Sequence, residues 1–142
     1  MTVTLVASAA ITASGNGGTL AKDYGNAKAA TFYLTISADE STAADRLNVY
    51  IQSSFDGGTT LQDFASFTQA AGNDANAGFV EQLSWVRDTN DNEQQLATDA
   101  GLTAGNVENG PVGNQWRVKW VVIDDSGSAS FTTKVDARIS VR

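Results

Sequence analysis

Pairs of acidic residues are the part of this sequence that could carry out acid–base chemistry. Asp124 and Asp125 are adjacent, and Asp56 and Asp63 flank one glycine-rich segment. Two carboxylates about 5–10 Å apart are the machinery of a glycosidase. The chain contains no histidine and no cysteine, which removes the commonest general base and all thiol chemistry. The first pair falls in a predicted hairpin turn, where Asp is ordinarily recruited to form the turn, and the second pair flanks another predicted turn. Because neither pair comes with a sequence sign of a cleft, we expect a protein that is not an enzyme.

The acidic stretch "DTNDNE" resembles the beginning of a calcium-binding loop. Asp88, Asn90 and Asn92 fall at positions 1, 3 and 5 of such a loop, and Asp99 falls at position 12. However, position 6 is Glu93, where a calcium loop needs glycine for its sharp turn. The segment therefore predicts a solvated acidic loop, and we expect no metal and no other cofactor.

The stretch "SSFDGGTTLQDF" contains a second motif, S-x-D-x-G-x-T followed by a large apolar residue, at residues 54–61. It resembles the Asp-box, a hairpin turn that recurs in sialidases and other sugar-active β-propellers. A propeller of four blades with about 40 residues each would exceed this chain of 142 residues. We therefore expect the motif to act as a turn, in which Asp56 accepts backbone N–H groups and Gly57 and Gly58 supply positive φ.

Alternating apolar and polar residues predict the strands that position these motifs. We expect strands at residues 30–37, 46–54, 61–67, 79–86, 115–124 and 131–141. Residues 2–14 predict a first strand with a kink near Ser8, ended by the glycines at 15–18. Glu81 interrupts an apolar row and so predicts an edge or interface strand. Residues 87–114 form a long irregular connection, a candidate contact loop with a short helix expected at 92–100.

Seven or eight such strands predict an all-β fold, an antiparallel β-sandwich that forms one domain over residues 1–142. A jelly roll and an immunoglobulin-like arrangement both stay open at this point, because periodicity does not set strand order. Residues 1–20 form either a strand or an extended N-terminal arm. We expect the last two strands, joined by residues 124–128, to pair as one long antiparallel hairpin.

Charge and hydropathy exclude several classes of partner. The net charge of −7 argues against nucleic acid, whose binding depends on Lys and Arg at phosphates. No segment approaches 18 uninterrupted apolar residues, so no membrane partner is expected. The beginning of the chain lacks the basic region of a signal peptide.

Basic residues are concentrated in the last two predicted strands. Five of the nine fall in the last 26 positions, and all five have the outward phase. In the predicted hairpin Arg117 opposes Asp136 and Lys119 opposes Lys134, and like charges directly opposite are destabilising. The face is either a solubilising surface or a docking face for an acidic partner. The candidate partner-binding residues are Arg117, Lys119, Lys134 and Arg138 of this face, Asn90 and Asn92 of the long loop, and Val3 and Leu5 of the first strand.

Three tryptophans, Trp85, Trp116 and Trp120, could form a platform on which sugar rings stack. Trp116 and Trp120 share their phase with Val118 and Val122, the row expected to face inward. Packing in the core is therefore the favoured role of the tryptophans.

The segments "RLNVYIQSSFDGGTTLQDFASFTQ", "WRVKWVVID" and "SASFTTKV", in this order, resemble small β-sandwich proteins encoded among the virion genes of tailed bacteriophages. Many of these are capsid decoration, or cement, proteins. The resemblance covers residues 47–69 and 116–135, with Leu61 where such proteins often have Trp. It implies a jelly-roll-like sandwich, which we favour over the immunoglobulin-like alternative. It also implies a structural protein without catalytic residues, made in the host cytoplasm and located on the capsid surface of the virion. It also implies a homotrimer whose partner is the major capsid protein.

Two other functions stay open at this point. The Asp-box-like turn and the tryptophans suggest a carbohydrate-binding module or a receptor-binding tail component. The acidic pairs suggest, as a third candidate, a small hydrolase that works with carboxylates alone.

Overall fold

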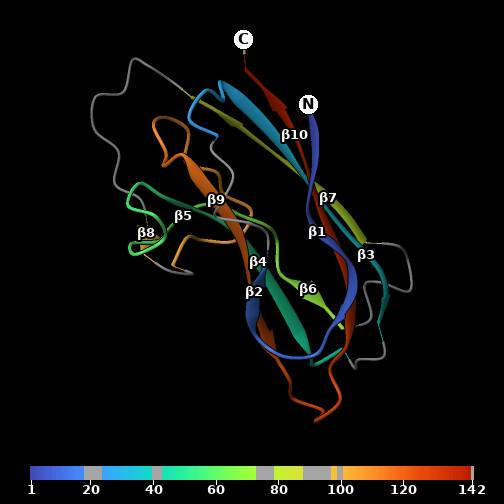
Figure 1. Cartoon of the computed structure of the whole chain (residues 1–142). Helices are drawn as coiled ribbons and strands as arrows, with labels where there is room; N and C mark the ends of the chain where they lie inside the picture. The colour runs from blue at the N-terminus through green and yellow to red at the C-terminus, as the bar shows by residue number, and fades with distance from the viewer. Residues whose placement is uncertain (18–23, 40–42, 73–78, 88–96, 99–100, 142) are drawn as a thin grey trace.

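A computed structural model describes residues 1–17, 24–39, 43–72, 79–87, 97–98 and 101–141. Strands form two sheets that face each other, as Figure 1 shows, so the prediction of an all-β sandwich is confirmed. The predicted strands between residues 30 and 141 are all present. The elements in chain order are β1 (Thr2–Ile11), β2 (Gly15–Gly17), β3 (Ala29–Asp39), β4 (Arg46–Ser54), β5 (Gln62–Ser66), β6 (Ala70–Ala71), β7 (Phe79–Val86), β8 (Ala97–Thr98), β9 (Gln115–Ile123) and β10 (Phe131–Ser140).

The strand order is that of a jelly roll. Sheet A has the order β1-β10-β3-β7, and sheet B has the order β2-β9-β4-β5-β8, with β6 also paired to β4. The antiparallel pairs are nested: β1 with β10, β2 with β9, β3 with β7 and β4 with β5. Such nesting is what results when one long hairpin is rolled into two stacked sheets, which is the jelly-roll arrangement.

The predicted hairpin between the last two strands is wrong. β9 pairs with β2 and β4 in sheet B, whereas β10 pairs with β1 and β3 in sheet A. Arg117 therefore lies opposite Gln52, and Asp136 lies opposite Tyr33. Alternation tells which residues face inward, but it does not tell which strand is the neighbour, and here the chain crosses to the other sheet between β9 and β10.

The N-terminal segment is part of the sandwich. β1 pairs along β10 with register shifts between Thr4 and Val6 and between Val6 and Ala9, which brackets the predicted kink near Ser8. Gly15 and Gly17, which were expected to end the strand, instead lie in β2. Glycine is needed there because the Trp120 ring leaves no space for a side chain: a Cβ on Gly17 would lie 2.9 Å from the ring. The alternative of an extended arm is therefore wrong for residues 2–17, and residues 18–20 lie outside the described chain.

Aromatic rings fill the space between the sheets. Trp116 of β9 has ring centroids 5.3 Å from Trp85, 5.2 Å from Phe64 and 5.8 Å from Phe32, and Tyr24 packs on it at 4.9 Å. Trp85 and Trp116 are both fully buried, so the expected core role is confirmed for them. Each large apolar side chain buried in this way contributes about 1.5–3 kcal/mol before the entropy cost is subtracted.

The long connection departs from its prediction at one described point. Ala97 and Thr98 form β8 beside β5, so the predicted helix at 92–100 is wrong there. The remainder of that predicted helix, together with Asn90 and Asn92, lies outside the described residues.

Candidate functional site

The turn at residues 54–61 is held by its own side chains. Ser54 Oγ accepts the amide N–H of Gly58 at 2.8 Å and donates to the Asp56 carboxylate at 2.8 Å. The same carboxylate oxygen accepts the amide of Thr60 at 2.8 Å. Gly57 and Gly58 have φ values of 75° and 95°, as the motif predicts. The Asp-box-like segment is thus a rigid turn between β4 and β5.

These hydrogen bonds also set the acidity of Asp56. The Thr60 amide, then the Thr60 and Ser54 side chains, stabilise the charged carboxylate and lower its pKa to about 2. A carboxylate this acidic is a poor proton donor or acceptor near neutral pH. Beside it, Phe55 is exposed at the surface. The turn therefore presents an aromatic side chain on a stiff support and is poorly suited to acid–base work.

The other member of this acidic pair, Asp63, belongs to a buried polar network on sheet B. Asp63 Oδ1 accepts from Gln52 Nε2 at 2.8 Å, and Asp63 Oδ2 accepts from the amide of Leu102 at 3.2 Å. The Gln52 Oε1 atom accepts from Arg117 Nε at 2.8 Å. Gln52 and Asp63 are both fully buried, although alternation places Gln52 outward. The network ties the connection after β8 to the sheet, and the nearby Asp63 charge, after burial, raises the pKa of Tyr50.

The second acidic pair, Asp124 and Asp125, lies in the crossing between the sheets. Asp124 Oδ1 accepts the amide of Ala129 at 3.1 Å, as an aspartate in a turn does. The Asp125 amide donates to Asp45, a fully buried carboxylate that also accepts from the amide and hydroxyl of Ser126. The Asp124 and Asp45 carboxylates therefore hold this loop, and the turn role expected of the pair is seen for the Asp124 side chain, whereas Asp125 contributes its backbone amide.

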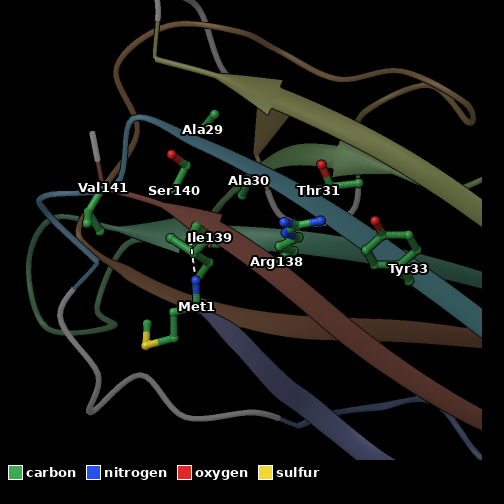
Figure 2. Close-up of a pocket in the computed structure, with 9 residues that line it drawn as sticks. All are labelled: Met1, Ala29, Ala30, Thr31, Tyr33, Arg138, Ile139, Ser140 and Val141. Carbon is green, nitrogen blue, oxygen red and sulfur yellow. Dashed lines mark hydrogen bonds between the residues drawn. The ribbon is translucent and has the colours of Figure 1, made fainter.

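Exposed apolar residues gather where the two chain ends meet. An open hollow of about 460 Å³ lies there against β3 and β10, lined by Met1, Ala29, Ala30, Thr31, Tyr33, Arg138, Ile139, Ser140 and Val141. Met1 pairs with β10 through its amino group, which donates to the Ile139 carbonyl at 2.9 Å (Figure 2). Met1 and Val141 are strongly exposed, as is Val86, which lies opposite Ala29 in the adjacent strand. We call Met1, Ala29, Val86, Arg138 and Val141 the terminal patch.

Arg138 is the one charged side chain among the residues that line this hollow. In Figure 2 its side chain extends from β10 toward Thr31 and Tyr33 of β3. Arg138 is exposed, and the register places it between Thr2 of β1 and Thr31. The patch therefore combines an accessible guanidinium with surrounding apolar groups, a combination enriched at protein interfaces.

The predicted partner-binding residues do not form one face. Arg117 and Lys119 lie on the outer side of sheet B, while Lys134 and Arg138 lie on the outer side of sheet A. Lys134 forms an ion pair with Asp136 at 2.6 Å, and Asp136 also accepts from the Thr4 hydroxyl at 2.7 Å. Val3 and Leu5 are buried in the core, so they hold β1 in place and are not accessible to a partner in this structure. Of the six predicted residues that the structure describes, Arg138 alone joins the terminal patch, and Asn90 and Asn92 lie outside the described residues.

Three remaining features of the described residues concern metal binding, membrane spans and the third tryptophan. Among residues with described positions, no group of three or more acidic, His or Cys residues is arranged to hold a metal ion. None of the described segments forms a helix long and apolar enough to cross a membrane. Trp120, the third tryptophan, is partly buried and donates from Nε1 to the Ala13 carbonyl at 3.0 Å, so it packs at the sandwich margin.

The sequence did not indicate the terminal patch, because Met1, Val86 and Val141 are isolated in the chain. The pairings of β1 with β10, of β10 with β3 and of β3 with β7 bring them together. By contrast, the exposure of Phe55 at the turn could have been inferred, since it precedes Asp56 in a motif whose ends are fixed.

Comparisons with known proteins give no relative from which a function could be transferred. No protein-family model matches the sequence, and no match is found among curated proteins or among solved structures.

Proposed function

We propose that this chain is a structural virion protein, a decoration subunit that seats on a phage capsid shell and stabilises it without catalysing a reaction. The resemblance to phage decoration proteins supports this proposal, and the first two of its three segments lie side by side in sheet B, whereas the third contributes to β10 of sheet A. Residues 47–69 supply β4, the rigid turn and β5, and β9 lies beside β4 in the same sheet. The jelly-roll arrangement is also the one that the resemblance implies.

The observation that carries the proposal is the terminal patch. A decoration subunit needs an accessible apolar surface on a rigid support, because contacts to the shell must be made without ordering flexible chain. Met1, Val86 and Val141 provide that surface around the Arg138 guanidinium, and the backbone beneath them is fixed by the pairing of β10 with β1 and β3. Its partner is the major capsid protein, through an apolar area that contains a carboxylate for Arg138.

Several identical copies on one shell would strengthen modest individual contacts. If subunits associate as the homotrimer that the resemblance implies, three terminal patches would engage neighbouring shell subunits together. Once one patch is bound, the others bind at a high effective concentration, which raises the total affinity without any new contact.

A sedimentation experiment tests the proposal. Purified chain is mixed with empty shells assembled from the capsid protein encoded beside its gene, and the shells are then pelleted. We expect the chain to pellet with the shells to a saturating level and to raise the temperature at which they disassemble. Failure of the unmodified, folded chain to pellet with these shells contradicts the proposed function.

A pair of variants on one strand locates the contact. Arg138→Ala should reduce shell binding at least tenfold, because arginines at the centre of an interface often contribute more than 1.4 kcal/mol. Lys134→Ala is the matched control, since Lys134 lies on the same strand and face but is paired with Asp136. Equal binding by both variants would exclude the terminal patch while leaving shell binding itself established.

A further inference from the structure

The exposed edges of the two sheets differ in how they are protected. Sheet A ends at β1 and β7, and sheet B ends at β2 and β8. β2 and β8 have only three and two residues, and β1 is interrupted by two register shifts. Short or bulged edge strands discourage pairing with another chain. β7 has eight residues in regular register with β3, and so has neither protection.

Backbone geometry shows which groups of β7 point away from the sheet. The Val86 amide donates to Asn109 Oδ1 at 2.9 Å, and the Val86 carbonyl accepts from the Gly110 amide at 2.9 Å. Since consecutive residues of an antiparallel strand bond to opposite sides, Val80, Gln82 and Ser84 direct their backbone groups the same way. Within the described chain, Asn109 and Gly110 cover this edge only at Val86, and the outward groups of the other three residues have no partner.

The side chains along this edge carry no charge. Val80 is 66% exposed and Val86 is 51% exposed, with the exposed Gln82 and Ser84 between them. Glu81, the one charged residue of β7, has the opposite phase, and its carboxylate accepts from the amide and hydroxyl of Thr68 at 2.8 and 3.0 Å. The edge therefore lacks the outward charge that commonly deters strand pairing, although the whole chain has a net charge of −7.

We propose that β7 pairs with β7 of a second copy of this chain, antiparallel and around a two-fold axis at Gln82. In this register Gln82 faces the partner's Gln82, and Val80 faces the partner's Ser84, so the residues with outward backbone groups face one another. The two glutamine amides meet at the axis, where each can donate to and accept from the other. Sheet A of one copy continues into sheet A of the other, in the closed two-fold symmetry that is commonest among oligomers.

The length of the open edge favours this occupant. β7 begins at Phe79, which in this register lies opposite the partner's Trp85. Strand pairing thus stops before Val86, the residue that Asn109 and Gly110 already cover. The open stretch is therefore centred on Gln82 and complementary to itself. This inference does not depend on the proposed function.

Single cysteines test the register, because the natural chain has none. In a hydrogen-bonded antiparallel pair the facing Cα atoms are about 5.5 Å apart, within the range a disulfide spans. Gln82→Cys should therefore give a disulfide-linked dimer on mild oxidation, seen on a non-reducing gel. Ser84→Cys is the matched control and should stay unlinked, since its two copies would lie about 14 Å apart. A mixture of Val80→Cys and Ser84→Cys chains should cross-link, whereas Ser84→Cys alone should not.

Sedimentation of the unmodified chain supplies the second readout. We expect a dimer, or a hexamer if trimers also form, and we expect Gln82→Lys to halve the mass because two lysines would meet at the axis. Ala10→Lys, an equal charge change at the bulged edge of the same sheet, should leave the mass unchanged, and circular dichroism would establish that both variants fold. The proposal is overturned if Gln82→Cys links no better than Ser84→Cys, or if Gln82→Lys leaves the mass unchanged. A trimer insensitive to Gln82→Lys would overturn it while leaving the proposed capsid role intact.

Discussion

The outer sides of the two sheets carry similar polar residues in different surroundings. On sheet B, Asp63 and Gln52 are fully buried between Arg117 and the Leu102 amide. On sheet A, Lys134 and Asp136 form an ion pair while their side chains remain 43% and 24% exposed. An outward polar residue of this jelly roll is therefore structural where the long connection encloses it, and is accessible to a partner where nothing covers it.

The largest expected effect on stability distinguishes Asp63, on the outer side of sheet B, from Asp136, on the outer side of sheet A. Asp63→Ala should lower the free energy of unfolding by about 3 kcal/mol, because it removes a buried carboxylate that accepts from both Gln52 Nε2 and the Leu102 N–H. Asp136→Ala should lower it by less than about 1 kcal/mol, because its partners Thr4 and Lys134 regain water. Urea denaturation of both variants measures the difference, and equal losses would contradict the distinction between the two sides.

Two arginines make the same comparison with a smaller effect. Arg117→Ala should lower the free energy of unfolding by about 1.5 kcal/mol, because Gln52 Oε1 loses its donor in an enclosed site. Arg138→Ala should change stability by less than about 0.5 kcal/mol, because Arg138 is exposed. Thermal unfolding at matched salt distinguishes them. A stability loss at Arg138 as large as that at Arg117 would show that the terminal patch also has a structural role.

The sequence allowed the strands to be located but not their partners. Phe32, Leu34 and Ile36 alternate with polar residues because one side of β3 is buried and the other is not. The side of the strand that faces the core could therefore be predicted from the sequence. The pairing of the strands could not be predicted in this way, because β9 and β10 follow each other in the sequence but lie in different sheets. Gly15 and Gly17 form a strand against expectation, since the space beside the Trp120 ring excludes a side chain there.

The candidate site was less predictable than the fold, for a physical reason. Local chemistry determines the turn at residues 54–61, and there the roles of Asp56, Gly57 and Gly58 follow from their order alone. Gln52 had the phase of an exposed residue, and its burial is favoured by its hydrogen bond to Asp63 and by the one it accepts from the distant Arg117. Arg138 could be recognised as outward, but its position between two chain ends depends on pairings of residues more than 100 positions apart.

Asp56 is an intermediate case, an exposed carboxylate whose partners belong to its own turn. Its pKa of about 2 lies below the ordinary 3.8, so its contribution to stability is complete above pH 3.8 and is lost as the pH falls through about 2. Carboxyl NMR during an acid titration should show this low midpoint. Ser54→Ala should raise the midpoint, because it removes one donor to the carboxylate. A midpoint near the ordinary value of 3.8 in the natural chain would contradict the turn geometry.

The smallest expected effect belongs to the ion pair on sheet A. Burial alone would raise the pKa of Asp136, but hydrogen bonds from Lys134 and Thr4 and the Lys134 charge outweigh burial and lower it. The pair therefore adds stability above the ordinary pKa of an aspartate, and this is lost as the pH falls through the lowered value. Lys134→Met should raise the Asp136 pKa and change the free energy of unfolding by less than about 0.5 kcal/mol, because the pair is exposed and screened. The pKa change should shrink when the titration is repeated in 1 M salt, whereas a larger, salt-independent stability loss would mean that the outer side of sheet A is covered after all.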